Sequence, residues 1–248
     1  MSASPSSEPL APQPPPWRLT DLAAGLALLL VGYVVLLSAM VGVARALDVS
    51  PETDAGGTLL FAIVTLLLEV WIGAVVWLMA RRRGVRGADL GLDRPQSWRL
   101  VAYAVSGAYV SLLAYGIAVE VAERLMHADL GLLKQTNGLT DTEMNTTAVW
   151  FILGVSVMAL APLSEELFFR GFLFRALQGR AGLVPGMGLS ALAFSVFHLN
   201  VGVVVPFFAI GLIFAWAYYA SGSLWTTIAA HTIFNAISFV ATLAGVAS

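Results

Sequence analysis

Long apolar runs recur along the chain and constrain its fold more than any other feature. A helix needs about 20 apolar residues to cross a hydrocarbon core of about 30 Å, and runs of this kind predict seven candidate spans. They cover residues 22–43, 59–79, 100–122, 148–178, 188–199, 203–219 and 224–244. Because the run at 188–199 is short enough for a half-span, the pattern is compatible with six to eight crossings. The predicted fold is therefore an all-α, polytopic membrane helix bundle of about seven transmembrane spans.

Composition supports the same environment and excludes several functions. Of the 248 residues, 58% are hydrophobic and 11% are charged, whereas a soluble domain carries about 25% charged residues. The absence of cysteine excludes disulfides, thiolate catalysis and cysteine-ligated zinc. No basic face or nucleic-acid motif is present, so we expect lipid and not nucleic acid as the partner. Nothing in the sequence indicates an oligomeric state.

Three segments follow from these patterns. Residues 1–16 are rich in proline and serine, which predicts a disordered tail. Residues 17–87 hold the N-terminal transmembrane helices, and residues 88–248 hold the membrane core that carries the polar groups described below. The first apolar run is too long for a signal-peptide core and is interpreted as a retained anchor.

Arginine distribution predicts the orientation of the bundle. Basic residues collect on the cytoplasmic side of membrane proteins. Two groups of arginines mark such ends, one after the second span and one toward the end of the fourth. They are Arg81, Arg82, Arg83, Arg86, Arg94 and Arg99, and Arg170, Arg175 and Arg180. Alternation of the spans then places the N-terminus in the cytoplasm, in agreement with Arg18.

The fourth apolar run contains charged residues, which are unusual inside a membrane span. A carboxylate at the centre of a membrane helix costs at least about 2.5 kcal/mol, so such groups are expected to be paired or functional. Glu166 and Arg170 are four residues apart, share a helical face and are predicted to neutralise each other. Glu165 points about 100° away from Glu166 and is left as the free carboxylate. It is the candidate general base.

Proline interrupts the same run. Residues 147–178 would measure about 48 Å as one helix, well beyond the hydrocarbon core. Pro162 removes a helical hydrogen bond but suits the first turn of a new helix. We therefore expect a kink or break near Pro162, with Ser164, Glu165 and Glu166 in the first turn of the second half.

Two of the three histidines lie in other apolar runs at a similar depth. By helical rise, Glu165 and His198 are each about 20 Å, and His231 about 12 Å, from the ends predicted to be cytoplasmic. Asn235 follows His231 by four residues and shares its face. Titratable groups gathered in one layer are what acid–base chemistry requires. Glu69 fits the same layer either as a member or as a structural partner, whereas His127 is expected to be solvated.

At these residues the chain resembles a known family. The segments E-E-L-F-F-R, F-S-V-F-H and H-T-I-F-N, which begin at Glu165, Phe194 and His231, are similar to the three motifs of the CPBP family of CAAX-protease and bacteriocin-processing intramembrane proteases. The resemblance covers the chain from about Leu90 to its end and implies an intramembrane endopeptidase similar to the CAAX prenyl endopeptidase. The implied substrates are membrane-anchored, lipidated or bacteriocin-like peptides.

The resemblance also implies a role for each motif residue. Glu165 with His198 would activate a water, His231 and Asn235 would stabilise the oxyanion, and Glu166 with Arg170 would fix the helix. A tuned carboxylate can act as a base, and amide or imidazole N–H groups can act as oxyanion donors. The alternative is a zinc site made of Glu165, His198 and His231. Metal-free chemistry is favoured because H-E-x-x-H is absent and a ligating Glu165 would need another base.

Two other classes of function stay open at the sequence level. One is a catalytically silent membrane protein of the same fold that binds peptides or confers immunity. The other is a proton-coupled transporter in which Glu165, Glu69 and the histidines form a relay. Transporters usually contain internal repeats, and none is visible here. Replacing Glu165 by Gln would separate a protease from a binding protein.

Overall fold

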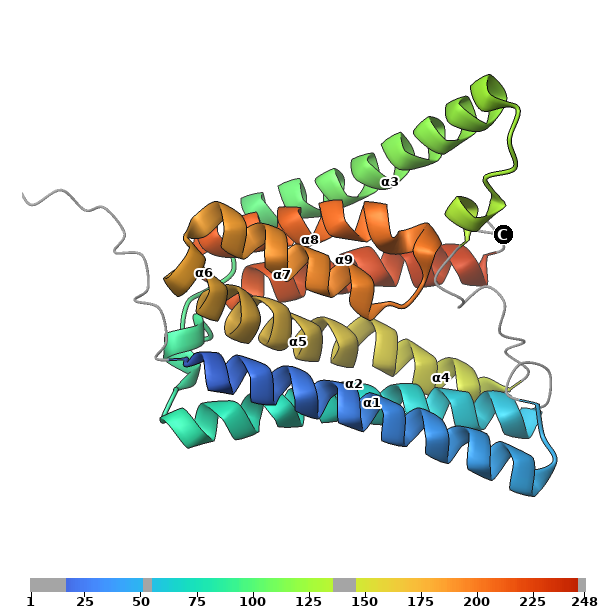
Figure 1. The fold of residues 1–248 in the computed structure, drawn as a ribbon, viewed down its shortest axis with the longest axis horizontal. Helices are drawn as coiled ribbons and strands as arrows, with labels where there is room; N and C mark the ends of the chain where they lie inside the picture. Colours follow the sequence, from blue (N-terminus) through green and yellow to red (C-terminus); the bar gives the residue numbers. More distant parts are fainter. Residues whose placement is uncertain (1–16, 51–54, 136–145, 245–248) are drawn as a thin grey trace, which may run out of the picture.

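The computed structural model describes residues 17–50, 55–135 and 146–244, and the regular secondary structure in these ranges is all helical (Figure 1). No strand occurs within them, as the predicted all-α bundle requires. The expectation of a disordered tail at residues 1–16 lies outside the described residues.

Six helical runs in the described ranges are long and apolar enough to cross a membrane. They are α1 (Leu19–Leu47), α2 (Ala55–Arg83), α3 (Trp98–Met126), the continuous run Thr147–Ala181, α8 (Val201–Ser221) and α9 (Leu224–Leu243). A seventh helix, α7 (Leu183–Phe197), has 15 residues and is shorter than a full crossing. The bundle is therefore that of an integral multi-pass membrane protein. The short apolar run at residues 188–199 corresponds to α7.

The fourth span differs from the expectation at Pro162. It consists of α4 (Thr147–Val155), a π-helical segment η3 (Ser156–Leu160), α5 (Ala161–Glu166), a second π-helical segment η4 (Leu167–Phe174) and α6 (Arg175–Ala181), with helical backbone at every junction. Of the predicted kink or break, the break is wrong, because the backbone stays helical through Pro162. Pro162 does stand in the first turn of α5, which ends at Glu166. The amide of Ala161 donates to the carbonyl of Ser156, so a wider turn absorbs the proline, which has no N–H. No free helix N-terminus lies beside Glu165.

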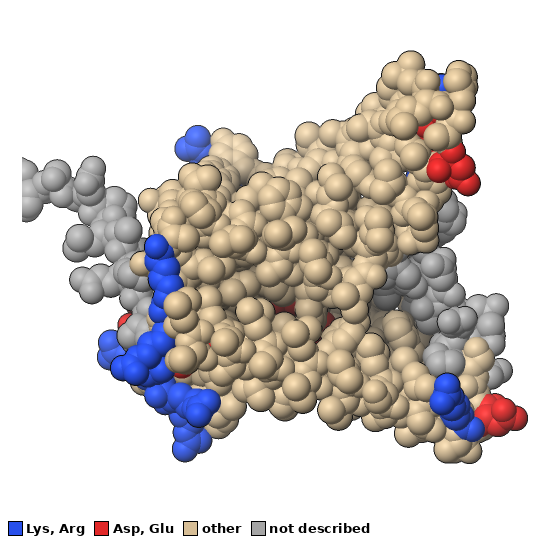
Figure 2. Space-filling model, in the orientation of Figure 1, with Lys and Arg blue, Asp and Glu red and all other residues tan. Residues whose placement is uncertain are grey.

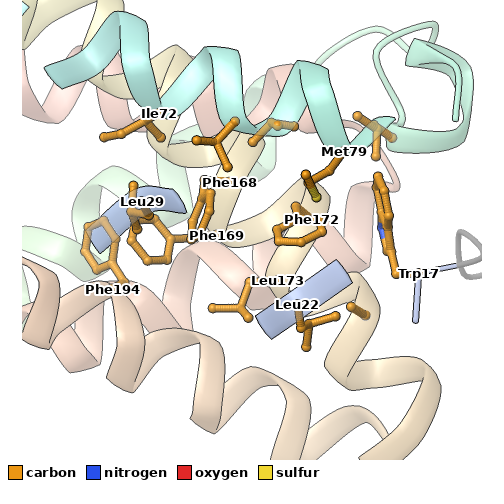
Figure 3. Close-up of a cluster of buried hydrophobic side chains, with 14 residues drawn as sticks. Trp17, Leu22, Leu29, Ile72, Met79, Phe168, Phe169, Phe172, Leu173 and Phe194 are labelled. Carbon is orange, nitrogen blue, oxygen red and sulfur yellow. The ribbon is translucent and has the colours of Figure 1, made fainter. Parts of the chain in front are cut away.

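The aromatic side chains of η4 form the centre of the largest core. Phe168, Phe169 and Phe172 are fully buried among apolar residues of α1, α2 and α7 (Figure 3). The rings of Phe172 and Trp17 meet edge to face at 4.9 Å between centroids, and those of Phe169 and Phe194 do so at 5.3 Å. Such edge-to-face packing holds the fourth span, and the charged groups on it, in a fixed rotation.

Small residues allow other helices to approach closely. On α8, a Cβ added to Gly211 would lie 2.9 Å from the Cα atom of Ala191 on α7. On α1, Gly32 leaves room for Trp71 of α2, whose indole Nε1 donates to the carbonyl of Leu28 at 3.0 Å. Close backbone approach through small residues is a common way for membrane helices to associate.

Arginine side chains gather at one end of the bundle, near the start of α1 and the end of α2 (Figure 2). There Arg83 donates two hydrogen bonds of 2.8 Å to Asp21, which ties α2 to α1. Arg170 does not belong to this end because its side chain is completely buried. The charged end agrees with the predicted cytoplasmic side, and the orientation itself stays a prediction.

Between η1 (Gly87–Leu90) and η2 (Gly131–Lys134) lies α3, the outermost helix at the top of Figure 1. Its start packs against α8 and α9 through the buried residues Val101, Ala104 and Ala108. At its other end, the short η2 returns toward α8, and the hydroxyl of Tyr115 donates to the carbonyl of Leu133 at 3.0 Å. These contacts place α3 and η2 along one wall of the cavity described next.

Candidate active site

The fourth span carries the ion pair that the sequence spacing predicted. Arg170 Nη1 donates to Glu166 Oε1 at 2.8 Å, and both side chains are completely buried. A second guanidinium nitrogen donates to the carbonyl of Gly211 at 3.3 Å, and the guanidinium lies 4.6 Å from the centroid of the Phe194 ring. Hydrogen bonding and a cation–π contact therefore join α5, α7 and α8 around Arg170.

Glu165 is the free carboxylate of the pair of glutamates. The residue is only 6% exposed, and its Oε2 atom has no hydrogen-bond partner within the described ranges. His231 of α9 lies near this oxygen, with 4.0 Å between its Nε2 and Glu165 Oε2. Among the described residues, Glu166 Oε2 has no hydrogen-bond partner either, but the other oxygen of Glu166 is paired with Arg170. Glu165 is therefore the glutamate left to act on another molecule.

His231 stands between the two glutamates. Its Nδ1 lies 3.0 Å from Glu166 Oε1, the oxygen that also accepts from Arg170. Because a carboxylate paired with arginine can only accept, Nδ1 of His231 carries the hydrogen. In the neutral imidazole, Nε2 then has a free lone pair directed toward Glu165.

His198, directly after α7, has the same tautomer for a different reason. Its Nδ1 lies 2.9 Å from the carbonyl oxygen of Phe194, which can only accept, so Nε2 is again the unprotonated nitrogen. The ring packs edge to face on Phe207, with 4.5 Å between centroids. The imidazole is thus held by one hydrogen bond and by aromatic rings.

Asn235 lies one turn after His231 on α9. Its Nδ2 donates to the carbonyl of Val157 at 2.8 Å, which joins α9 to the π-helical segment η3. An amide nitrogen has two hydrogens, so one stays available to a molecule in the cavity.

One cavity of about 810 Å³ brings these residues together. Glu165, His198, His231 and Asn235 all line it, so the fourth span, the end of α7 and α9 each bring polar groups to the same cavity. A hollow is visible in the face of the molecule shown in Figure 2, with red carboxylate atoms at its base. The rest of the wall is mostly apolar, with Phe61, Leu112, Phe207, Ile210 and Phe239 among its residues.

The cavity also reaches a second, smaller group of charges. At its far end lie Glu120 of α3 and Lys134 of η2, which form an ion pair at 3.2 Å. Lys134 also pairs with Glu123, and the two carboxylates raise the pKa of its ammonium group above the usual value. This end is exposed, so its ion pairs contribute little to stability.

Sequence reasoning left Glu69 open and gave Ser164 no role. Glu69 of α2 is 9% exposed and lines the same cavity, and the Oγ atom of Ser164 lies 2.5 Å from its Oε2. The signal for Ser164 was present, since it is a polar residue directly before Glu165 in an apolar run. His127 ends α3, is exposed and does not line the cavity, as expected.

The placed side chains do not fit the alternative zinc site. Two ligand atoms on a tetrahedral zinc lie about 3.3 Å apart, given bond lengths of about 2.0–2.1 Å. The separation between Glu165 Oε2 and His231 Nε2 is 4.0 Å. In the described ranges, no three histidine, aspartate or glutamate side chains are grouped closely enough to hold a metal ion.

Fold and site together define a helical membrane protein with a carboxylate and two histidines around a buried cavity. Residues 146–237 match the family model "Type II CAAX prenyl endopeptidase Rce1-like". This match over part of the chain bears out the resemblance predicted from the three motifs. The matched range contains Glu165, His198, His231 and Asn235.

A curated relative matches more weakly. The chain is 23% identical over 141 residues to the Bacillus subtilis protein titled "Putative membrane peptidase YdiL". The match covers 54% of this chain and 53% of the relative, so the chain spans about half the length of that protein. No solved structure matches the chain significantly.

Proposed function

We propose that this protein is an intramembrane endopeptidase that uses Glu165 to activate a water molecule. The observation that carries the proposal is the partnerless Glu165 oxygen, which faces a cavity beside His231 while Glu166 is occupied by Arg170. The two adjacent glutamates thus have different environments. Glu166 is a carboxylate paired with Arg170, and Glu165 is left free to act as a base. The match to the Rce1-like family model supports the same class of activity.

In the first step, Glu165 and His198 orient the attacking water. Both line the cavity, and each has a bare acceptor, Oε2 on Glu165 and Nε2 on His198. A water between them can donate one hydrogen to each. As its oxygen bonds to the peptide carbonyl carbon, Glu165 takes one proton, and the carbonyl oxygen becomes the oxyanion.

His231 and Asn235 are suited to stabilise that oxyanion. Asn235 has a free N–H directed by its bond to Val157, and His231 can donate from Nε2 once it holds a second proton. The Glu166 carboxylate behind Nδ1 would stabilise the imidazolium, as a carboxylate does in a catalytic triad. The tetrahedral intermediate then collapses, the carbon–nitrogen bond breaks, and the amine nitrogen takes up a proton.

In this proposal no step passes through a metal ion. The 4.0 Å between Glu165 Oε2 and His231 Nε2, wider than the spacing of two ligands on one zinc ion, supports that choice. The proposed substrates are membrane-anchored peptides, with prenylated Cys-a-a-X peptides as the first choice because of the match to the Rce1-like family model. An apolar cavity wall is compatible with a lipidated chain. We further propose that the basic end of the bundle is cytoplasmic.

Cleavage of a library of membrane-anchored peptides, prenylated Cys-a-a-X peptides included, tests the proposal. Purified wild type, Glu165→Gln and His231→Ala are compared, each with and without a strong zinc chelator, with His127→Ala as the control outside the cavity. We expect cleavage by wild type and the control only, unaffected by chelator. Loss on chelation that zinc restores would contradict the metal-free mechanism, and a folded wild type that binds peptides without cleaving them would indicate a binding protein.

A further inference from the structure

Glu69 is a third carboxylate in the catalytic cavity, and it comes from a different helix. It lies on α2, is buried, and contacts Ser164, the residue before Glu165, at 2.5 Å between Oε2 and Oγ. The residue lies outside the matched range 146–237. The reaction proposed above assigns no role to Glu69.

Charge pairing around the cavity leaves Glu69 without a cation. Arg170 pairs with Glu166, and Lys134, at the far end, pairs with Glu120 and Glu123. No described lysine, arginine or histidine lies within ion-pair distance of Glu69. Even if His231 carries a second proton and a positive charge, the two negative charges of Glu165 and Glu166 already balance the positive charges of His231 and Arg170. An unpaired buried charge is strongly disfavoured, so such a group is expected to hold a proton.

The hydrogen bonds of Ser164 are compatible with the same state. Its Oγ lies 2.9 Å from the carbonyl oxygen of Leu160 and 3.3 Å from that of Ala161, in addition to 2.5 Å from Glu69. A hydroxyl has one hydrogen, and carbonyl oxygens have none. When Ser164 donates to its own helix, the hydrogen in the contact with Glu69 must belong to Glu69.

We propose that Glu69 is held protonated and is the acid that protonates the leaving amine. This inference rests on the proposed endopeptidase function. In the balanced cycle, Glu165 takes a proton from water, and Glu69 gives its proton to the amine nitrogen as the carbon–nitrogen bond breaks. The proton on Glu165 then passes to Glu69, so the net reaction is peptide plus water to acid plus amine. Two carboxyl groups in opposite protonation states are the usual way to combine base and acid at one site.

The two carboxyl groups differ in their polar neighbours, and each disfavours a second negative charge beside it. Glu69 contacts the neutral hydroxyl of Ser164 on α5, and its nearby charged group is the carboxyl group of Glu165. Around Glu165 are the imidazole of His231 on α9 and the Glu166–Arg170 pair. His198, after α7, completes the set of titratable groups that face this part of the cavity.

A change of leaving group distinguishes an acid that protonates the amine from a residue with a structural role only. A thiolate leaves without prior protonation because thiols have pKa values of about 8.5, whereas an amine needs a proton. The substrates are a farnesylated Cys-a-a-X peptide and its analogue with a thioester at the scissile bond. We expect Glu69→Gln to lower kcat for the peptide by about 10²- to 10⁴-fold and to affect the thioester by less than about tenfold.

Matched variants separate chemistry from folding. Glu165→Gln should lower both reactions, since each needs an activated water, and Glu69→Asp should restore part of peptide cleavage. Thr58→Val removes another buried hydroxyl of α2, one that donates to its own helix at Ala55 and lies outside the cavity, and it should change neither. The Glu69→Leu variant tests folding, because it should unfold no more easily than wild type. Equal losses on both substrates in Glu69→Gln would overturn the proposal.

Infrared spectroscopy tests the proton without relying on cleavage. The wild-type minus Glu69→Gln difference spectrum at neutral pH should contain the carbonyl band of a protonated carboxylic acid, shifted in D₂O. Absence of that band, with normal cleavage by wild type, would overturn the role of Glu69 alone. Absence of cleavage by folded wild type would overturn the proposed function, whichever infrared result is found.

Discussion

His231 and Glu166 are joined by a contact of 3.0 Å between Nδ1 and Oε1, and the same oxygen accepts from Arg170 at 2.8 Å. One carboxylate oxygen therefore fixes both the imidazole tautomer and the guanidinium. Glu166 is occupied by these two partners and is not available as the base for a water. This contact therefore explains why Glu165, and not Glu166, is the proposed base.

The first prediction concerns the buried pair of Glu166 and Arg170. Arg170→Met should lower the free energy of unfolding by about 3–5 kcal/mol, because it leaves a buried carboxylate unpaired. The double variant Glu166→Gln with Arg170→Met should be more stable than Arg170→Met alone, since both charges are removed together. Chemical unfolding of the purified variants in detergent micelles measures both values.

The exposed pair of Arg124 and Glu120 is the matched control. It has the same four-residue spacing, with a nitrogen–oxygen distance of 2.8 Å, but its side chains are 77% and 45% exposed. Arg124→Met should change the free energy of unfolding by less than about 1 kcal/mol. Equal effects of Arg124→Met and Arg170→Met would show that burial does not govern the strength of the inner pair.

The second prediction concerns Asn235 as an oxyanion donor. Asn235→Leu should lower kcat by about 10²- to 10³-fold with little change in KM, since the donor acts mainly on the charge of the transition state. Asn235→Asp should be at least as impaired, because a carboxylate repels the oxyanion. Steady-state kinetics on a cleaved peptide measures the split. A rise in KM with unchanged kcat would assign Asn235 to substrate binding.

Local spacing predicted the parts of the site that depend on one helix. A spacing of four positions from Glu166 to Arg170 was enough to predict the ion pair, and the similar depths derived from helical rise agree with the cavity that Glu165, His198 and His231 share. Both inferences use the fixed geometry of a helix. They did not depend on how the helices pack.

Features that depend on packing were missed or wrong. The contact of Glu69 with Ser164 joins residues 95 positions apart and requires the relative shift of α2 and α5, which no local pattern contains. The break at Pro162 was wrong because a π-helical turn absorbs the missing donor. Arg170 was counted among the arginines that mark an end of the bundle, although its side chain is completely buried and paired with Glu166.

The third prediction concerns the contact between α7 and α8. Gly211→Ala should lower the free energy of unfolding by about 1–3 kcal/mol, because the added methyl would lie 2.9 Å from the backbone of Ala191. It should also reduce cleavage, since the carbonyl of Gly211 accepts from Arg170. Gly116→Ala on α3 is the control, as nothing lies within 4 Å of its added Cβ. If Gly211→Ala is as stable as Gly116→Ala, the two helices are free to separate.

The last prediction concerns orientation and uses the absence of cysteine. Arg86 has a side chain that is 82% exposed at the basic end, and Asp129 is exposed beyond the other end of α3. One span separates them, so Arg86→Cys and Asp129→Cys should lie on opposite sides of the membrane. If the basic end is cytoplasmic, a membrane-impermeant thiol reagent applied to intact cells should label Asp129→Cys only. Both variants should react after permeabilisation, and labelling of Arg86→Cys in intact cells would reverse the proposed topology.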